Sequence, residues 1–292
     1  MQQLKRRLIG YGLGATVAGV LGYVGFIHKT EADTMTLLSS AEVHLKLAKS
    51  MPKLDAEGKP NPVRGNLLDQ ARDFVERARV RHPDLYLCLE MTAYINAQRG
   101  WYLEAAELYR AAQSAEAATP ESRSAALLNE VRMWRIVGQA KRALDALDDS
   151  AEFVLKKDVP ASQMEKVYLL RDLDRSVDSI SVAAEVARSS DDPLASIDAG
   201  LYLEESAARE LAEKAFRRAA EAEPMANYYL ARLKVRAKEF DIGLDLLRRV
   251  VASNRRQVQR LVELDAGVWN AVRSDARFTG LFAADKSARP GR

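Results

Sequence analysis

Small and apolar residues recur at helical spacing from Gly200 to Pro224, in the stretch GLYLEESAARELAEKAFRRAAEAEP. Ala212, Phe216 and Ala219 follow one another at intervals of four and three residues, which places them on one side of a helix. Gly200 lies twelve residues before Ala212, and Pro224 lies twelve residues after it. This pattern predicts one helix, a tight turn and a second helix, with small side chains where the two helices cross.

The same triplet of positions recurs along the chain, so we interpret it as an internal repeat. The copies, in chain order, are Ala71, Val75, Ala78; Ala105, Tyr109, Ala112; Ala143, Leu147, Ser150; and Gly243, Leu247, Val250. The first two copies are 34 residues apart (105 − 71), and 69 residues (212 − 143) separate the third copy from the triplet of the first stretch, which leaves room for one degenerate copy. We assign that copy to Ile180, Ala184 and Ala187.

The spacing, the turn glycines Gly100 and Gly138, and the closing Pro224 resemble the tetratricopeptide repeat, a helix-turn-helix unit of about 34 residues. The resemblance implies an all-α solenoid of about six helical hairpins, because each unit buries its apolar face only against its neighbours. It covers residues 29–254, and we expect capping helices over 255–284 and a solvated tail over 285–292. The family implies a protein-binding scaffold.

Residues 51–66 depart from this pattern. The stretch MPKLDAEGKPNPVRGN contains Pro52, Pro60 and Pro62. It predicts an extended loop ahead of a helix that begins near Asn66, and long loops are commonly either mobile or contact sites.

The chain opens with a basic segment, residues 1–7, followed by twenty uncharged residues from Leu8 to Ile27. About twenty apolar residues are needed to cross a bilayer as a helix, so we expect a transmembrane anchor over residues 8–28. A cleaved signal peptide is the alternative, although a small-residue cleavage site is poorly placed here. The cluster Lys5, Arg6 and Arg7 predicts a cytoplasmic N-terminus, with the repeats in the periplasm of a bacterium.

Four small residues recur every fourth position within the expected anchor and form a ridge that would let another membrane helix approach closely. They are Gly10, Gly14, Ala18 and Gly22.

Composition and charge narrow the classes of function. Of the 292 residues, 48% are hydrophobic and only 7% aromatic, which suits a helical protein with small-residue crossings. The net charge is +3, and the three N-terminal basic residues account for it, so the remaining chain sums to zero and shows no basic footprint for nucleic acid. The single cysteine, Cys88, excludes an internal disulfide.

No catalytic, metal or cofactor motif appears in the sequence. His28, His44 and His82 are scattered, and the chain has no phosphate loop or nucleophile elbow. Adjacent acids such as Glu204 and Glu205 do not face each other on a helix, and we interpret them as solvated surface. We therefore expect no enzyme activity and no cofactor.

In the tetratricopeptide family the first helix of each unit lines the concave side of the solenoid. By register, the resemblance implies a partner-binding groove lined by Glu90, Tyr94, Arg132, Arg135, Tyr228, Arg232 and Arg236. Arginines beside tyrosines suit a peptide that carries carboxylates and apolar side chains. The family's Lys and Asn carboxylate clamp is not reproduced, and the alternative is that the arginines are solvated and the tyrosines belong to the core.

Two functions remain open at this point. One is a membrane-tethered adaptor that binds a protein or peptide in its groove, for envelope assembly, translocation or secretion. The other is a permanent subunit of a membrane complex, held through the glycine and alanine ridge of its anchor.

Overall fold

The computed structural model describes residues 33–55 and 57–282. The chain divides into two compact units, Met1–Gln139 with Ser150–Phe153, and Ala140–Asp149 with Val154–Arg292. All regular elements among the described residues are helices, and the β pairs found there are the isolated bridges Leu54–Pro60 and Leu85–Glu116. The all-α class is thus confirmed for this part of the chain, and no helix in it is long and apolar enough to span a membrane.

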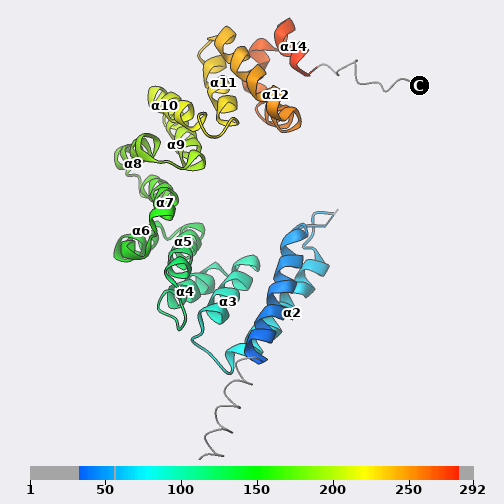
Figure 1. Cartoon of the computed structure of the whole chain (residues 1–292), viewed down its shortest axis with the longest axis vertical. Coiled ribbons are helices and arrows are strands. Elements are labelled where there is room, and N and C mark those ends of the chain that lie inside the picture. Colours follow the sequence, from blue (N-terminus) through cyan, green and yellow to red (C-terminus); the bar gives the residue numbers. More distant parts are fainter. Residues whose placement is uncertain (1–32, 56, 283–292) are drawn as a thin grey trace, which may run out of the picture. The chain divides into compact units, whose positions relative to one another are not determined.

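Unit 1 is a run of antiparallel helices, in which each helix packs on the next along the chain (Figure 1). Its elements are the helix over residues 33–50, α2 (Pro62–Arg79), α3 (Tyr86–Gln98), α4 (Tyr102–Gln113), α5 (Pro120–Ile136) and the 3-10 turn η1 (Ala151–Phe153).

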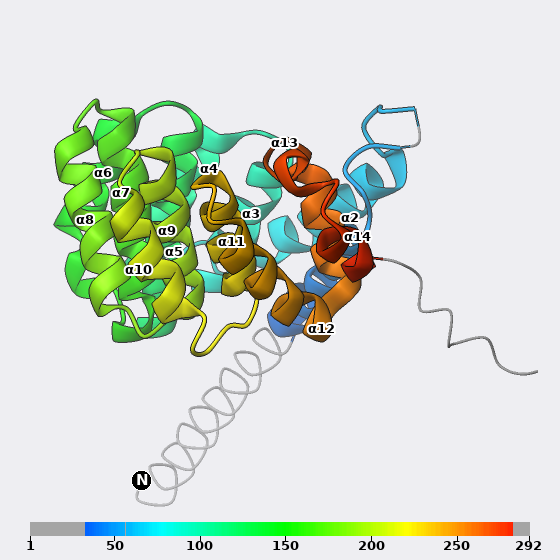
Figure 2. The same cartoon turned by 90° about the horizontal axis from the view of Figure 1, so that it is seen from above.

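Unit 2 stacks further hairpins. Its elements are α6 (Ala140–Asp149), η2 (Lys156–Asp158), α7 (Val159–Asp172), α8 (Ser176–Ser189), α9 (Pro193–Glu205), α10 (Arg209–Ala219), α11 (Ala226–Arg236), α12 (Phe240–Leu264), α13 (Ala266–Trp269), η3 (Asn270–Val272) and α14 (Ala276–Phe282). Sequential helices pack together, and α7 also contacts α9, α8 contacts α10, and α9 contacts α11 (Figure 2). Contact between every second helix is what a stack of helical hairpins requires.

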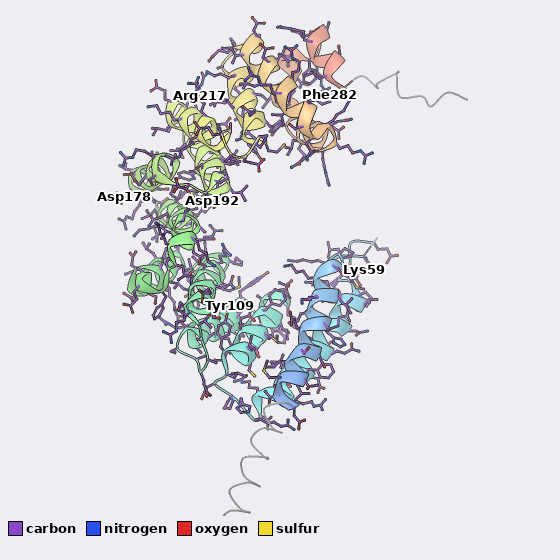
Figure 3. All side chains as sticks on the ribbon, in the orientation of Figure 1. Lys59, Tyr109, Asp178, Asp192, Arg217 and Phe282 are labelled. Carbon is purple, nitrogen blue, oxygen red and sulfur yellow. The ribbon has the colours of Figure 1, made fainter. Side chains whose placement is uncertain are left out.

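The crossing positions of the hairpins are occupied as the repeat predicts. Ala212, Phe216 and Ala219 are buried in α10, and a Cβ atom placed on Gly200 of α9 would lie 2.6 Å from the Phe216 ring. A side chain at position 200 would therefore overpack this contact, because the aromatic ring occupies its space. The equivalent α4 residue Tyr109 is buried in the same way (labelled in Figure 3).

The register assigned to the degenerate repeat was wrong by one residue. In α8 the buried residues are Ser179, Ala183, Val186 and Ala187, so Ala187 of the assigned triplet is buried, whereas Ile180 and Ala184 are half-buried. Ser179 fills the small-residue position: it has no exposed surface, and its hydroxyl donates to the carbonyl oxygen of Val167 at 2.8 Å. A buried serine whose hydroxyl group has a hydrogen-bond partner packs like alanine. A pattern of alanine and glycine alone therefore does not indicate this position.

The turn inside each hairpin places one residue in the left-handed region. Gly100 and Gly138 take this position in two hairpins, and Asp174, Ala207 and Lys238 take it in three others, with φ angles of 58°, 60° and 63°. The turn geometry is thus repeated even where glycine is absent, at a cost of about 1 to 2 kcal/mol for residues other than glycine.

The segment before α2 is shorter than the extended loop predicted over residues 51–66, and hydrogen bonds hold part of it. The helix begins at Pro62, four residues before Asn66, and the Asn61 side chain caps it by accepting from two backbone N–H groups. Within the loop, the Asp55 carboxylate accepts two further backbone N–H groups. The helix starts earlier than predicted because proline, which also marks loops, is favoured in a first helical turn.

Aromatic side chains close the C-terminal end of unit 2. The Trp269 ring is fully buried, and its centroid lies 5.8 Å from that of Tyr228 and 6.0 Å from that of Phe278. The ring of Phe282, which is labelled in Figure 3, follows with its centroid 5.5 Å from that of Phe278. The Arg277 guanidinium pairs with Asp241 at 2.8 Å and so ties α14 to the start of α12. These contacts cover the last hairpin.

Candidate functional site

A groove of about 560 Å³ lies between the helix over residues 33–50 and α3 in unit 1. We call it the first-hairpin groove. Its apolar lining is Met35, Leu38, Leu45, Leu87, Met91 and Tyr94, and its polar lining is Ser39, Glu42, Lys46, Lys49 and Glu90. It is an open groove whose apolar lining is accompanied by two carboxylates and two ammonium groups.

The sequence of α3 explains why one helix serves both the core and the groove. YLCLEMTAYINAQ is apolar on nearly every side, and Cys88 and Ile95 are fully buried. Leu87, Glu90 and Tyr94 are spaced by three and four residues, so they share a different side of the helix. That side is half-buried and lines the groove.

Glu90 is the notable charge in this groove. Burial raises the pKa of its carboxyl group above the ordinary value, and the nearby negative charge of Glu42 raises it further. Among the described residues, Glu90 takes part in no hydrogen bond or ion pair. A half-buried carboxylate without a cation is a costly arrangement that a positively charged ligand would relieve.

Glu42 differs from Glu90 because it already has a cation beside it. Its carboxylate lies 2.6 Å from the ammonium nitrogen of Lys46, one helical turn further along, and both side chains are exposed. Exposed pairs of this kind contribute about 0.3 to 0.5 kcal/mol and are easily exchanged. The groove therefore has one carboxylate in an ion pair that a ligand can replace, Glu42, and one carboxylate without an ion pair among the described residues, Glu90.

Burial also raises the pKa of the Tyr94 hydroxyl, which stays protonated near neutral pH and is available as a hydrogen-bond donor. The structure thus brings together Glu90 and Tyr94, two of the residues predicted for the groove. Arg132 is exposed and Arg135 half-buried on α5, and each interacts with other groups of the chain.

The residues predicted for the groove in unit 2 belong to an internal network. Tyr228 has no exposed surface and donates to the Asp265 carboxylate at 2.8 Å. The Arg232 guanidinium lies 2.5 Å from Glu204 and 3.2 Å from Asp265, and Arg236 donates to Glu204 at 2.6 Å. This network ties α9, α11 and the end of α12 together.

Two interpretations made from the sequence are corrected by this network. Glu204 is not solvated surface, because its side chain is only 5% exposed and is enclosed by the two arginines. Tyr228 is a core residue, as the alternative reading of the tyrosines proposed. Arg232, at 13% exposure, is engaged within the fold, whereas Arg236 keeps half of its surface.

The helix over residues 33–50 supplies the part of the groove that was not predicted. Glu42, Lys46 and Lys49 come from this helix, and the predicted groove included none of them. The ridge residues Gly10, Gly14, Ala18 and Gly22 lie outside the described residues, and within the described part no group of three potential metal ligands occurs.

No protein-family model matches the chain, and no curated protein matches it. Among solved structures it is similar to the crystal structure of the APC/C hetero-tetramer Cut9-Hcn1, with 13% sequence identity and a TM-score of 0.42. That match covers 81% of this chain and 45% of the other, so the chain spans less than half the length of its match.

Proposed function

We propose that the chain is a protein-interaction scaffold whose first-hairpin groove receives a segment of a partner protein. The observation that carries the proposal is the unpaired Glu90 carboxylate within an apolar groove of about 560 Å³. Such a groove is large enough for a few side chains, and apolar grooves with a few polar groups are typical binding sites.

The charges of the groove indicate the chemistry of that segment. Glu90 and Glu42 would accept a lysine or arginine side chain, while Leu38, Leu87 and Met91 would contact apolar neighbours on either side of it. The segment is therefore basic and apolar, which differs from the acidic peptide that the arginines had suggested. Lys46 would release Glu42 to the ligand at small cost, because that ion pair is exposed.

Photo-crosslinking in native cells tests this proposal. A photoreactive residue replaces Met35, which is 53% exposed and lines the groove, and the control places it at the more exposed Val177 of α8. We expect an adduct of one size from position 35 that is absent from position 177 and is lost in the Glu90→Lys variant. The same adducts from both positions, or an adduct that survives Glu90→Lys, would contradict the proposal.

Membrane attachment through residues 8–28 is a further part of the proposal, and the uncharged stretch Leu8–Ile27 supports it. With the basic N-terminus inside, the repeats face the periplasm of a bacterium. Protease added to cells with a permeabilised outer membrane should then digest the repeats. Complete protection of the repeats from the protease would indicate the opposite orientation, with the repeats in the cytoplasm.

The alternative, a permanent subunit of a membrane complex, is supported by the ridge of Gly10, Gly14, Ala18 and Gly22. Leucine at positions 14 and 22 should release the chain from such a complex while leaving it in the membrane. A fixed stoichiometry of co-purified partners that survives salt favours the subunit, whereas salt-labile partners favour the adaptor.

A further inference from the structure

A second charged surface lies on α12 of unit 2, far along the chain from the first-hairpin groove. From residue 246 to residue 262 the helix has five arginines and no acidic residue. We call these the α12 arginine surface: Arg248, Arg249, Arg255, Arg256 and Arg260.

Three of the five arginines of this surface have no ion pair among the described residues, whereas Arg248 pairs with Asp245 at 3.0 Å and Arg255 interacts with another group of the chain. Arg217 pairs with Glu213 at 2.5 Å, and Arg209 pairs with Glu239 at 2.8 Å. On α12, by contrast, Arg249, Arg256 and Arg260 are exposed and form no ion pair with any described residue. Like charges on one surface repel each other, and an anionic ligand would relieve that repulsion.

The rest of α12 argues against a lipid surface as the ligand. Helices that lie in a membrane interface insert an apolar side into the bilayer. On α12, the apolar residues Val250, Val258 and Val262 are already buried in the core of unit 2 with Trp269. The helix also exposes Ile242 and Leu264, but these lie near its two ends, 22 residues apart (264 − 242), and do not form a continuous apolar stripe for insertion.

A break in α12 shapes this surface. Asn254 has non-helical angles, φ −150° and ψ 68°, so Arg248 and Arg249 lie on one arm and the other three arginines on the next. The eleven steps from Arg249 to Arg260 would span about 16 Å in a regular helix, a distance that an extended chain covers with about five residues. A flexible polypeptide can follow the bend between the two arms.

From these observations we infer that the α12 arginine surface binds an acidic segment of a polypeptide, with several Asp or Glu residues within about five positions. Each planar guanidinium group can donate two parallel hydrogen bonds to one carboxylate, a bidentate geometry that lysine does not offer. This surface is separate from the first-hairpin groove, and its ligand carries the opposite charge.

The test uses the full chain in detergent and a fluorescein-labelled oligoglutamate peptide, with oligoglutamine as the neutral probe. Fluorescence anisotropy should show salt-sensitive binding of oligoglutamate and none of oligoglutamine. Replacement of Arg249, Arg256 and Arg260 by Glu should weaken binding about tenfold or more, whereas Lys at all three should give a smaller loss. Thermal melting verifies that each variant is folded.

The matched control changes net charge by the same amount elsewhere, with Lys53→Glu, Lys141→Glu and Lys214→Glu at exposed positions of other elements. It should retain binding within about twofold, because attraction between exposed charges is local at physiological salt. Equal loss in both triple variants would reduce the effect to net charge and overturn the proposal. Stronger binding to vesicles with about one third phosphatidylglycerol than to oligoglutamate would overturn it in favour of lipid.

This experiment separates the two surfaces. Failure of oligoglutamate to bind would overturn the α12 proposal and leave the first-hairpin groove untouched. The crosslinked adduct from position 35 depends on Glu90, so that outcome would not affect it.

Discussion

Replacement of Gly200 by alanine tests how closely the hairpins of unit 2 pack. A Cβ atom at this position would lie 2.6, 2.8 and 3.0 Å from three atoms of the Phe216 ring. That ring is fully buried and stacks on Tyr229 with a centroid separation of 5.7 Å, so it has little room to move. Overpacking of this kind costs about 1 to 3 kcal/mol.

The same substitution also has a favourable effect, because alanine is better than glycine in a helix by about 1 kcal/mol. The net change at position 200 should therefore be a loss of up to about 2 kcal/mol. Gly65 of α2 is the matched control, because a Cβ atom there would meet nothing within 4 Å. Gly65→Ala should stabilise by up to about 1 kcal/mol, so the two variants should change stability in different directions.

Thermal melting and hydrogen exchange of the full chain measure both effects. Amide protection should fall in α9 and α10 for Gly200→Ala and rise in α2 for Gly65→Ala. Phe216→Leu should remove part of the conflict, with a coupling energy between positions 200 and 216 of about 1 to 2 kcal/mol. Similar stabilisation by both alanine variants, or no coupling with Phe216→Leu, would refute the argument from close packing.

Three further changes test the networks and the turns. Arg232→Met leaves two enclosed carboxylates without their shared cation and should cost about 3 kcal/mol, whereas Arg248→Met breaks an exposed pair and should cost under about 1 kcal/mol, both by chemical denaturation. Lys238→Gly relieves a left-handed φ of 63° and should raise the melting temperature, while Gly100→Ala, at the equivalent turn, should lower it. Because the pKa of Glu90 is raised in the fold, its stabilising contribution is present below its ordinary pKa and is lost as pH rises; Glu90→Gln should raise the melting temperature near pH 7 and have little effect near about pH 4.

The fold could be predicted from the sequence where close packing of helices demands one type of residue. Ala105 and Ala212 must be small because helices cross over them, and both are fully buried. Position 179 shows the limit of that reasoning, since a serine satisfies the same steric demand by donating its hydrogen bond to Val167. Lys238 shows a second limit. The turn has a left-handed φ at this residue, which a glycine in the sequence would have indicated and a lysine does not.

The candidate site was less predictable because register tells which side of a helix a residue occupies and not what lies beside it. Glu90 and Arg232 were assigned to the same kind of surface. The structure gives Arg232 two carboxylate partners, Glu204 and Asp265, whereas Glu90 has none among the described residues. Those partners lie 28 and 33 residues away in the chain, distances at which sequence alone does not identify a contact.

This difference in partners also decides which charges can serve a ligand. A guanidinium that already bridges two enclosed carboxylates would have to give up both ion pairs, at a cost of several kcal/mol, before it could bind a partner. The Glu90 carboxylate has no ion pair to give up, and a bound cation would offset the desolvation that raises its pKa. Arg249, Arg256 and Arg260 on α12 likewise have no ion pair among the described residues to give up, but they are exposed, so an anionic ligand would relieve their mutual repulsion and not a desolvation. Neither the Glu90 carboxylate nor these three arginines have to break an ion pair with a described residue before a ligand binds, and the ligands that we propose for them are basic in unit 1 and acidic in unit 2.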